Sequence, residues 1–174
     1  MNIWKYYDGD LKYPDLGNYS HEKDMLKTNP KWAFEYTLKH GKDKELEPII
    51  AKSAKYSYEY AIQILEDAFK LGEPEIAKSS IYSYMYATDI LNGKPFKLGE
   101  PAIAKSPELA VEYASLILEK PFKLAEPYIA KSETASKKYT QLVLYKDFIL
   151  NGKLICKYDE ESDIDMDFDF DDLH

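Results

Sequence analysis

Arginine is absent from this chain of 174 residues, and cysteine occurs once. All 23 basic residues are lysines. Arginine is the side chain best suited to bidentate contacts with phosphate and guanine, so its absence argues against a specific nucleic-acid binder. The lone Cys156 excludes a disulfide within the chain and fits a reducing compartment. We therefore expect a cytoplasmic protein.

Long apolar runs and catalytic motifs are lacking as well. No segment is apolar enough to cross a bilayer, and the N-terminal residues lack the apolar stretch of a secretory signal. The three histidines, His21, His40 and His174, lie far apart without zinc-ligand spacing, and the seven glycines form no phosphate loop. Cys156 follows two apolar residues, which favours a buried hydrophobe over a nucleophile. We expect no enzyme, no metal and no cofactor.

The net charge of −8 arises in the C-terminal segment. Residues 158–174 contain nine acids and no lysine, whereas the rest of the chain is close to neutral. Repulsion among these acids opposes compaction and predicts a disordered tail, which lacks the glycine and terminal glutamate of a calcium loop. The alternative is a partner-binding tail, in which rings enter a groove and carboxylates meet a basic rim. Its candidate residues are Asp163, Asp165, Asp167, Phe168, Asp169, Phe170, Asp171, Asp172 and Leu173.

One short phrase occurs four times in the middle of the chain. It reads EPIIAKS, EPEIAKS, EPAIAKS and EPYIAKS, beginning at Glu47, Glu73, Glu100 and Glu126, so the spacings are 26, 27 and 26 residues. A fixed period in the twenties indicates a small supersecondary unit that buries its apolar face only by stacking on its neighbours.

Each unit also contains a central tyrosine, at Tyr36, Tyr60, Tyr86, Tyr113 and Tyr139. A small residue three positions before it and an aliphatic pair four and five positions after it form the apolar stripe of a helix. The serine that closes each phrase is a candidate N-cap, and Ser106 before Pro107 is the clearest case. A short second helix should start at each Glu-Pro and point its isoleucine (Ile50, Ile76, Ile103, Ile129) into the core.

These patterns predict an all-α fold, a right-handed-type α-solenoid of four to five long-helix/short-helix repeats with an acidic disordered C-terminal tail. The expected domains are an N-terminal capping segment (1–28), a helical repeat domain (29–157) and the tail (158–174). A link that contains a phenylalanine (Phe69, Phe96 or Phe122) follows three of the long helices and precedes the next Glu-Pro. Asp147 stands where the preceding link has Pro121. We therefore expect the last helix to continue to Asn151-Gly152, with Leu154, Ile155 and Cys156 closing the final apolar face.

The central Tyr-Ala, the Ile-Leu pair, the Phe-containing link and Glu-Pro-x-Ile-Ala-Lys-Ser resemble the short helical repeats of mostly uncharacterised proteins from tailed phages and giant viruses. The resemblance covers about residues 30–150. It implies an α-solenoid from a phage or similar mobile genome, and hence the cytoplasm of a host. It implies no activity and no functional residue.

Two further surfaces are candidates for binding. Phe34, Tyr58 and Tyr84 lie two residues before the central tyrosine and outside the apolar stripe, so they could form an exposed aromatic ladder, or lie flat on the neighbouring repeat. The lysines of the units could align in a stripe or simply be solvated. They are Lys52, Lys78, Lys105 and Lys131, with Lys70, Lys97 and Lys123 in the links.

The leading functional hypothesis is a non-enzymatic scaffold that binds a host or phage protein through its repeat face, its tail or both. A first alternative is a nucleic-acid mimic, whose tail occupies the basic groove of a host nucleic-acid-binding or defence protein. A second is weak nucleic-acid binding by the lysine stripe. The sequence leaves the oligomeric state and the partner open, and no membrane association is expected.

Overall fold

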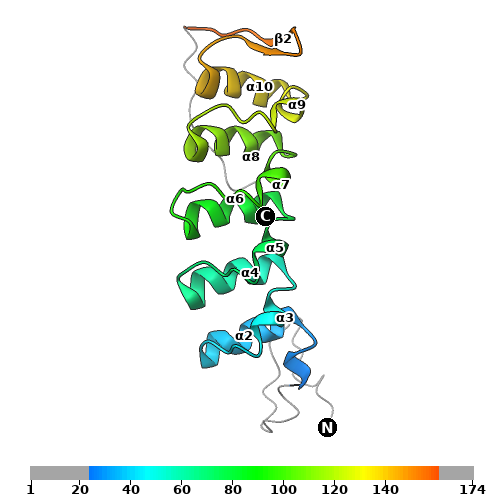
Figure 1. Cartoon of the computed structure of the whole chain (residues 1–174), viewed down its shortest axis with the longest axis vertical. Helices are drawn as coiled ribbons and strands as arrows, with labels where there is room; N and C mark the ends of the chain where they lie inside the picture. Colours follow the sequence, from blue (N-terminus) through cyan, green and yellow to red (C-terminus); the bar gives the residue numbers. More distant parts are fainter. Residues whose placement is uncertain (1–23, 161–174) are drawn as a thin grey trace.

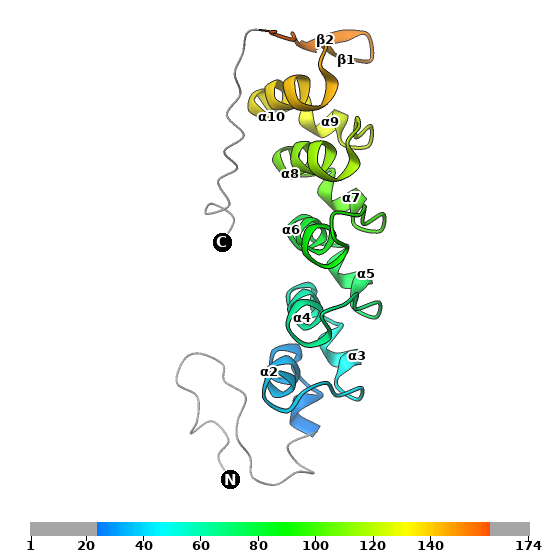
Figure 2. The same cartoon turned by 90° about the vertical axis from the view of Figure 1, so that its left-hand side faces the viewer.

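A computed structural model describes residues 24–160 of the chain, and this part is mostly helical with one small sheet (Figure 1). Long and short helices alternate along the sequence. The long helices lie side by side on one side of the molecule and the short helices on the other (Figure 2). Each long helix contacts the next, as α4 contacts α6 and α6 contacts α8.

Four of the five long helices change their hydrogen-bond spacing part-way. They are α2 (Pro30–His40), α4 with η2 (Ala54–Tyr60, Ala61–Leu65), α6 with η3 (Ser80–Met85, Tyr86–Ile90), α8 with η4 (Pro107–Glu112, Tyr113–Leu118) and α10 with η5 (Glu133–Tyr139, Thr140–Leu144). The short helices are α3 (Glu47–Ile50), α5 (Glu73–Ile76), α7 (Glu100–Ile103) and α9 (Glu126–Ile129). The strands are β1 (Phe148–Leu150) and β2 (Lys153–Cys156).

The elements η2 to η5 are π-helical turns, a feature that the sequence analysis does not predict. Their backbone N–H groups bond five residues back, as Leu91 N does to the Tyr86 carbonyl oxygen at 3.0 Å. Such turns are rare, and here they recur at the same place in successive units. A residue in left-handed conformation follows each one closely: Glu66, Asn92, Glu119 and Tyr145, with φ between 50° and 53°.

The helix N-termini mostly follow the prediction. The hydroxyls of Ser53, Ser79 and Ser132 accept from backbone N–H groups three residues on, at 3.5, 3.4 and 3.2 Å. Ser106 was expected to be the clearest cap, but its side chain accepts no capping hydrogen bond. That prediction is wrong, and Pro107 is not the reason, because Asn29 caps α2 beside Pro30 in the same position. Ser106 has a ψ of 103°, whereas the three serines that do cap have ψ values of 119° to 126°.

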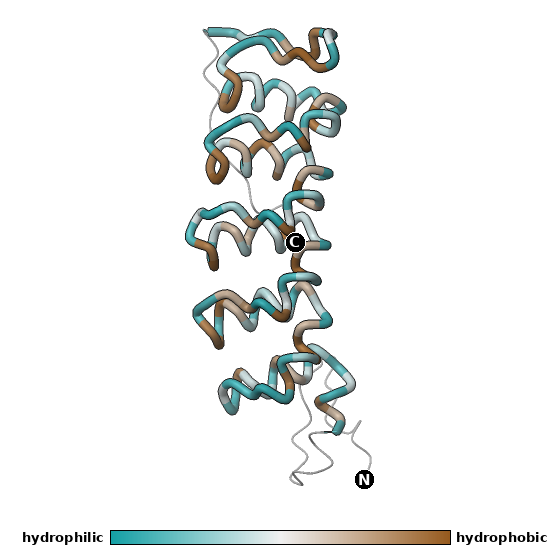
Figure 3. Tube along the Cα trace, in the orientation of Figure 1, coloured by the Kyte–Doolittle hydropathy of each residue, from teal (hydrophilic) through white to brown (hydrophobic). Residues whose placement is uncertain are grey.

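The core consists of the repeated residues. The predicted isoleucines and the tyrosines Tyr60, Tyr86, Tyr113 and Tyr139 are fully buried. Apolar stretches recur at the far ends of the long helices from α4 onwards and in the short helices, whereas α2 ends in hydrophilic residues (Figure 3). Each tyrosine ring packs on the phenylalanine of its own link, as Tyr86 does on Phe96 at 5.0 Å between ring centroids. The repeated columns are therefore packing positions.

The C-terminal end corrects the all-α expectation. The last long helix ends at Leu144, and β1 pairs antiparallel with β2 around Asn151-Gly152. Both turn residues have positive φ (52° and 77°), the geometry of a tight hairpin turn rather than a helix end. Leu154, Ile155 and Cys156 thus belong to a strand. The physical reason lies in Phe148, which is buried against Tyr139 at 5.3 Å as Phe122 is against Tyr113.

Two sets of earlier expectations lie outside the described residues. They concern most of the N-terminal capping segment and the tail from residue 161 onwards, which includes every tail residue suggested to bind a partner. Between residues 24 and 160, no helix has the length and apolar character needed to cross a membrane.

Candidate binding site between the long helices

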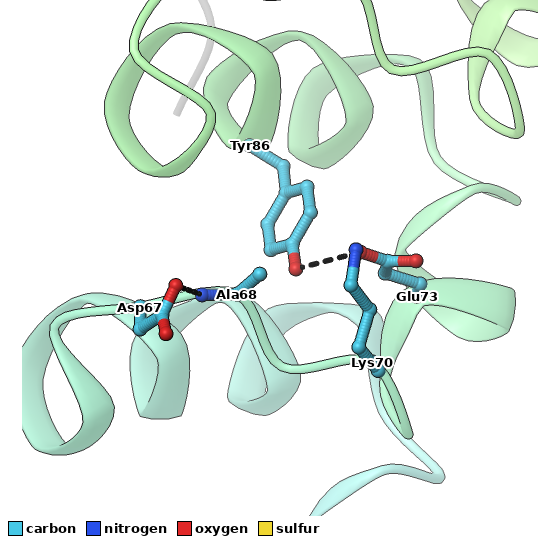
Figure 4. Close-up of polar contacts among 5 residues, drawn as sticks. All are labelled: Asp67, Ala68, Lys70, Glu73 and Tyr86. Atoms are coloured by element: carbon cyan, nitrogen blue, oxygen red, sulfur yellow. Dashed lines mark hydrogen bonds and ion pairs between the residues drawn. The ribbon is translucent and has the colours of Figure 1, made fainter.

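A polar network repeats in the interior beside the short helices. The Tyr86 hydroxyl donates to Glu73 Oε1 at 3.1 Å, and Lys70 Nζ lies 2.8 Å from the same oxygen (Figure 4). Burial and the Glu73 charge raise the pKa of this hydroxyl. The same hydrogen bond joins Tyr60 to Glu47, Tyr113 to Glu100 and Tyr139 to Glu126. In each repeat one glutamate oxygen thus joins the start of a short helix to the tyrosine of the long helix that follows.

This network alters the expected lysine stripe. The link lysines Lys70, Lys97 and Lys123 each pair with the glutamate that opens the next short helix, at 2.8 to 2.9 Å. Lys78 pairs with Glu75, and Lys131 Nζ lies 5.4 Å from the centre of the Tyr128 ring. Lys52 and Lys105 are exposed. Most of the stripe's positive charge is thus matched by local carboxylates, which weakens a nucleic-acid-binding role.

The predicted exposed aromatic ladder is wrong. Phe34, Tyr58 and Tyr84 are 6%, 6% and 3% exposed. Their rings lie against the next unit, as in the Phe34–Tyr56 and Tyr58–Tyr82 pairs, whose centroids are 5.7 and 5.9 Å apart. In these units the residue two positions before the central tyrosine lies on the side of the helix that packs on the neighbouring unit, so its side chain is covered. The alternative, rings lying on the neighbouring repeat, describes this column.

Beside these rings the long helices leave a hollow of about 590 Å³. It spans three successive units, with residues from α4, α6 with η3, and α8. Ile81, Met85 and Leu109 give it an apolar lining. The other lining residues are Lys55, Tyr58, Glu59, Tyr82, Tyr84, Thr88 and Asp89. We refer to this set as the tyrosine hollow.

The polar groups of the tyrosine hollow form a connected set. Asp89 accepts from the Tyr58 hydroxyl at 2.5 Å and from the Thr88 hydroxyl at 2.7 Å. Glu59 accepts from Gln63. Burial, together with the hydrogen bond to Asp89, raises the pKa of Tyr58, and burial with Glu112 raises that of Tyr84. These phenols therefore stay protonated and neutral, and the hollow carries two carboxylates and one ammonium, that of Lys55.

Sequence analysis brought Tyr58 and Tyr84 forward but missed Tyr82, Glu59 and Asp89. A signal for Tyr82 was present, because the position four before the central tyrosine is aromatic in the first three units (Trp32, Tyr56, Tyr82). The position just before the central tyrosine is glutamate in three of the five units (Glu35, Glu59, Glu112) and Met85 or Lys138 in the other two, whereas the position of Asp89 has no acid in any other unit. The repeated glutamate was therefore a signal for Glu59, and Asp89 had none.

A second hollow, of about 460 Å³, lies where the described chain ends. Its lining joins α10 and η5 to the residues after β2, and includes Lys137, Gln141 and Asp159. Gln141 Nε2 donates to the Asp159 carbonyl oxygen at 2.6 Å, which holds the segment after β2 against the last long helix.

No metal site accompanies these hollows. Among residues 24–160, no group of three or more His, Cys, Asp or Glu side chains could hold a metal ion. The chain matches no protein-family model, no curated protein and no solved structure in comparisons with known proteins.

Proposed function

We propose that the chain is a non-enzymatic helical repeat scaffold, an α-solenoid of the right-handed type, which binds a protein partner on its long-helix face. The tyrosine hollow is the observation that carries this proposal. It is formed by three units together, it combines an apolar lining with a polar rim, and it is of the size that binding sites commonly have.

The chemistry of the hollow fits binding better than turnover. Its phenols are held neutral, and its Asp89 carboxylate already accepts two hydrogen bonds. Tyrosine is a favoured anchor at protein interfaces because it supplies a large contact area at low entropic cost. The resemblance to repeats of phages and giant viruses supports a partner of host or phage origin, met in the host cytoplasm.

Affinity capture from a host lysate tests the proposal. The bait is the full chain, compared with Tyr82→Ala in the hollow, Leu98→Ala on an exposed link, and a truncation after Glu160. We expect a defined partner that Tyr82→Ala loses and both controls keep. Loss in the truncation alone, with steep weakening at high salt, would favour the nucleic-acid mimic instead. Circular dichroism confirms that each variant is folded.

A further inference from the structure

We propose that the tyrosine hollow binds an arginine side chain on an extended peptide segment of the partner. This inference rests on the proposed function and names the chemistry that the hollow recognises. Three properties of the lining support it: neutral aromatic rings, an excess of carboxylate over ammonium, and an apolar wall for the stem of a long side chain.

The tyrosine rings of the hollow favour a cationic ligand. Tyr58, Tyr82 and Tyr84 line one space although they belong to two successive units, and the Tyr58 and Tyr82 rings are 5.9 Å apart. Tyr82 is the partly exposed ring among them, whereas Tyr58 and Tyr84 are nearly buried and contribute only the small part of each side chain that is exposed. A cation within about 6 Å of an aromatic centroid is attracted by the electron-rich ring face, and a guanidinium plane also stacks on it. The same chemistry already operates at the edge of the hollow, where Lys55 Nζ lies 5.9 Å from the centre of the Tyr56 ring.

The charges select the sign of the ligand. Glu59 and Asp89 line the hollow from α4 and η3, and Lys55 is the cation among its lining residues. A phosphate or an acidic segment would meet two carboxylates there, so this site disfavours nucleic acid and the chain's own acidic tail. A guanidinium would pair with the carboxylates, and its planar donors suit them better than a compact ammonium does.

The apolar wall accounts for the rest of the side chain. Ile81, Met85 and Leu109 can cover the methylene stem that carries a guanidinium. The volume exceeds that of one side chain, which leaves room for an apolar neighbour in the partner's sequence. Since the chain contains no arginine, none of its own segments supplies the same ligand.

The test is a titration of the full chain with acetyl-Ala-Leu-Arg-Leu-Ala-amide, followed by NMR shifts of the backbone amides. Matched peptides replace arginine by citrulline, which keeps the shape without the charge, or by lysine. We expect shifts at residues of α4, α6 and η3. The dissociation constant should rise about tenfold with citrulline and by a smaller factor with lysine.

Protein variants separate the contributions. Glu59→Gln and Asp89→Asn should each weaken the arginine peptide about three- to tenfold without affecting the citrulline peptide. Tyr82→Phe should retain binding and Tyr82→Leu should lose it, because the ring face and not the hydroxyl holds the cation. Glu75→Gln, outside the hollow, is the matched charge control and should bind as the unchanged chain does.

Equal binding of the citrulline peptide, or no effect of Glu59→Gln and Asp89→Asn, would overturn the inference. So would arginine-dependent shifts confined to residues outside the hollow. A lysate partner that depends on Tyr82 but not on either acid would leave the scaffold proposal standing and remove arginine recognition. A partner indifferent to Tyr82 would remove the scaffold proposal at this face.

Discussion

A missing side chain in two links determines how closely the short helices approach the long ones. A Cβ atom on Gly72 would lie 2.5 Å from the Cβ and Oγ of Ser57, and one on Gly99 equally close to Ser83. Both glycines have ordinary helical backbone angles, so space rather than conformational freedom requires them. In the next unit the two positions are Ala125 and Ala110, a pair with neither glycine nor serine.

Gly72→Ala should lower the free energy of unfolding by about 1–3 kcal/mol, because neither the Ser57 Cβ nor the helix backbone can move away freely. Urea unfolding followed by circular dichroism measures the change. Leu71→Ala is the neighbouring control, and since this leucine is half exposed it should change stability by about 0.5 kcal/mol. Equal effects of the two substitutions would contradict the packing explanation.

A second residue-scale feature is the half-buried carboxyl of Glu112. Burial raises its pKa, although the hydrogen bond from Tyr84 and the charge of Lys138 act in the opposite direction. Its Oε2 is fully enclosed and has no hydrogen-bond partner. The folded chain thus holds this proton more tightly than the unfolded chain does. The resulting stabilisation is complete below the ordinary carboxyl pKa and is lost as the pH rises through the raised value.

Glu112→Gln should therefore gain stability relative to the unchanged chain as the pH increases from about 4 to about 7. The neutral amide imposes no charge on the enclosed site at either pH. Urea midpoints of both proteins across this range give the comparison. Parallel curves would show that Glu112 titrates in the folded chain as it does in the unfolded one.

At the residue scale, sequence pattern predicted what repeats and missed what varies. The buried isoleucines and tyrosines could be predicted because each occurs at every unit. The partners of the tyrosine hydroxyls could not, since Tyr86 and Glu73 are 13 residues apart and meet only through the turn between the helices. Of the acids of the tyrosine hollow, Glu59 stands at a position that is glutamate in three units, whereas Asp89 has no repeated signal.

At the scale of elements, the helix pairs follow from capping and apolar spacing, but the π-helical turns do not. No residue type signals a π turn, which is recognised only from backbone hydrogen bonds that reach five residues back. The hairpin was missed for another reason. Because Asp147 replaces the proline of the preceding link, the helix was predicted to continue. It ends instead just before Tyr145, which has a left-handed backbone conformation.

Glu119→Asn should stabilise the chain by up to about 1 kcal/mol. Glu119 has a φ of 50°, a conformation that costs most L-residues energy but suits asparagine, and Asn92 occupies the same place in the preceding unit. Thermal and urea unfolding measure the gain. Lys120→Asn, at the next position, is the control for composition. If the free energy of unfolding of Glu119→Asn did not exceed that of the control, the left-handed conformation of Glu119 would not destabilise the chain.

Phe148→Ala should lower stability by about 3–5 kcal/mol and detach the hairpin from α10, because this ring is buried against Tyr139. Ile149→Ala is the adjacent control, with a side chain 58% exposed, and should cost less than about 1 kcal/mol. Urea unfolding gives both values, and amide exchange in β1 and β2 reports the hairpin. A hairpin that stays protected in Phe148→Ala would refute this attachment.

At the scale of the whole molecule, the long helices of successive units contact one another, as α2 with α4, α4 with α6, α6 with α8 and α8 with α10. If the α-solenoid proposal is correct, a second copy of residues 73–99 inserted after Gly99 should extend the stack. Both the urea midpoint and the m-value should then rise, since more surface is buried in one cooperative unit. An insert of the same residues in shuffled order is the control. An unchanged m-value would count against end-to-end stacking.

The hairpin begins at Phe148, a position that does not restrict how many units precede it. Phe148 contacts Tyr139, the last central tyrosine, just as a link phenylalanine contacts the tyrosine of its own unit. The hairpin therefore packs on the final long helix through the same contact that a further link would make. In-frame gain or loss of whole units before the last one would leave the contact between the hairpin and the last long helix unchanged. If the α-solenoid proposal is correct, gene duplication would lengthen the stack while the contact between Phe148 and the last central tyrosine stayed the same.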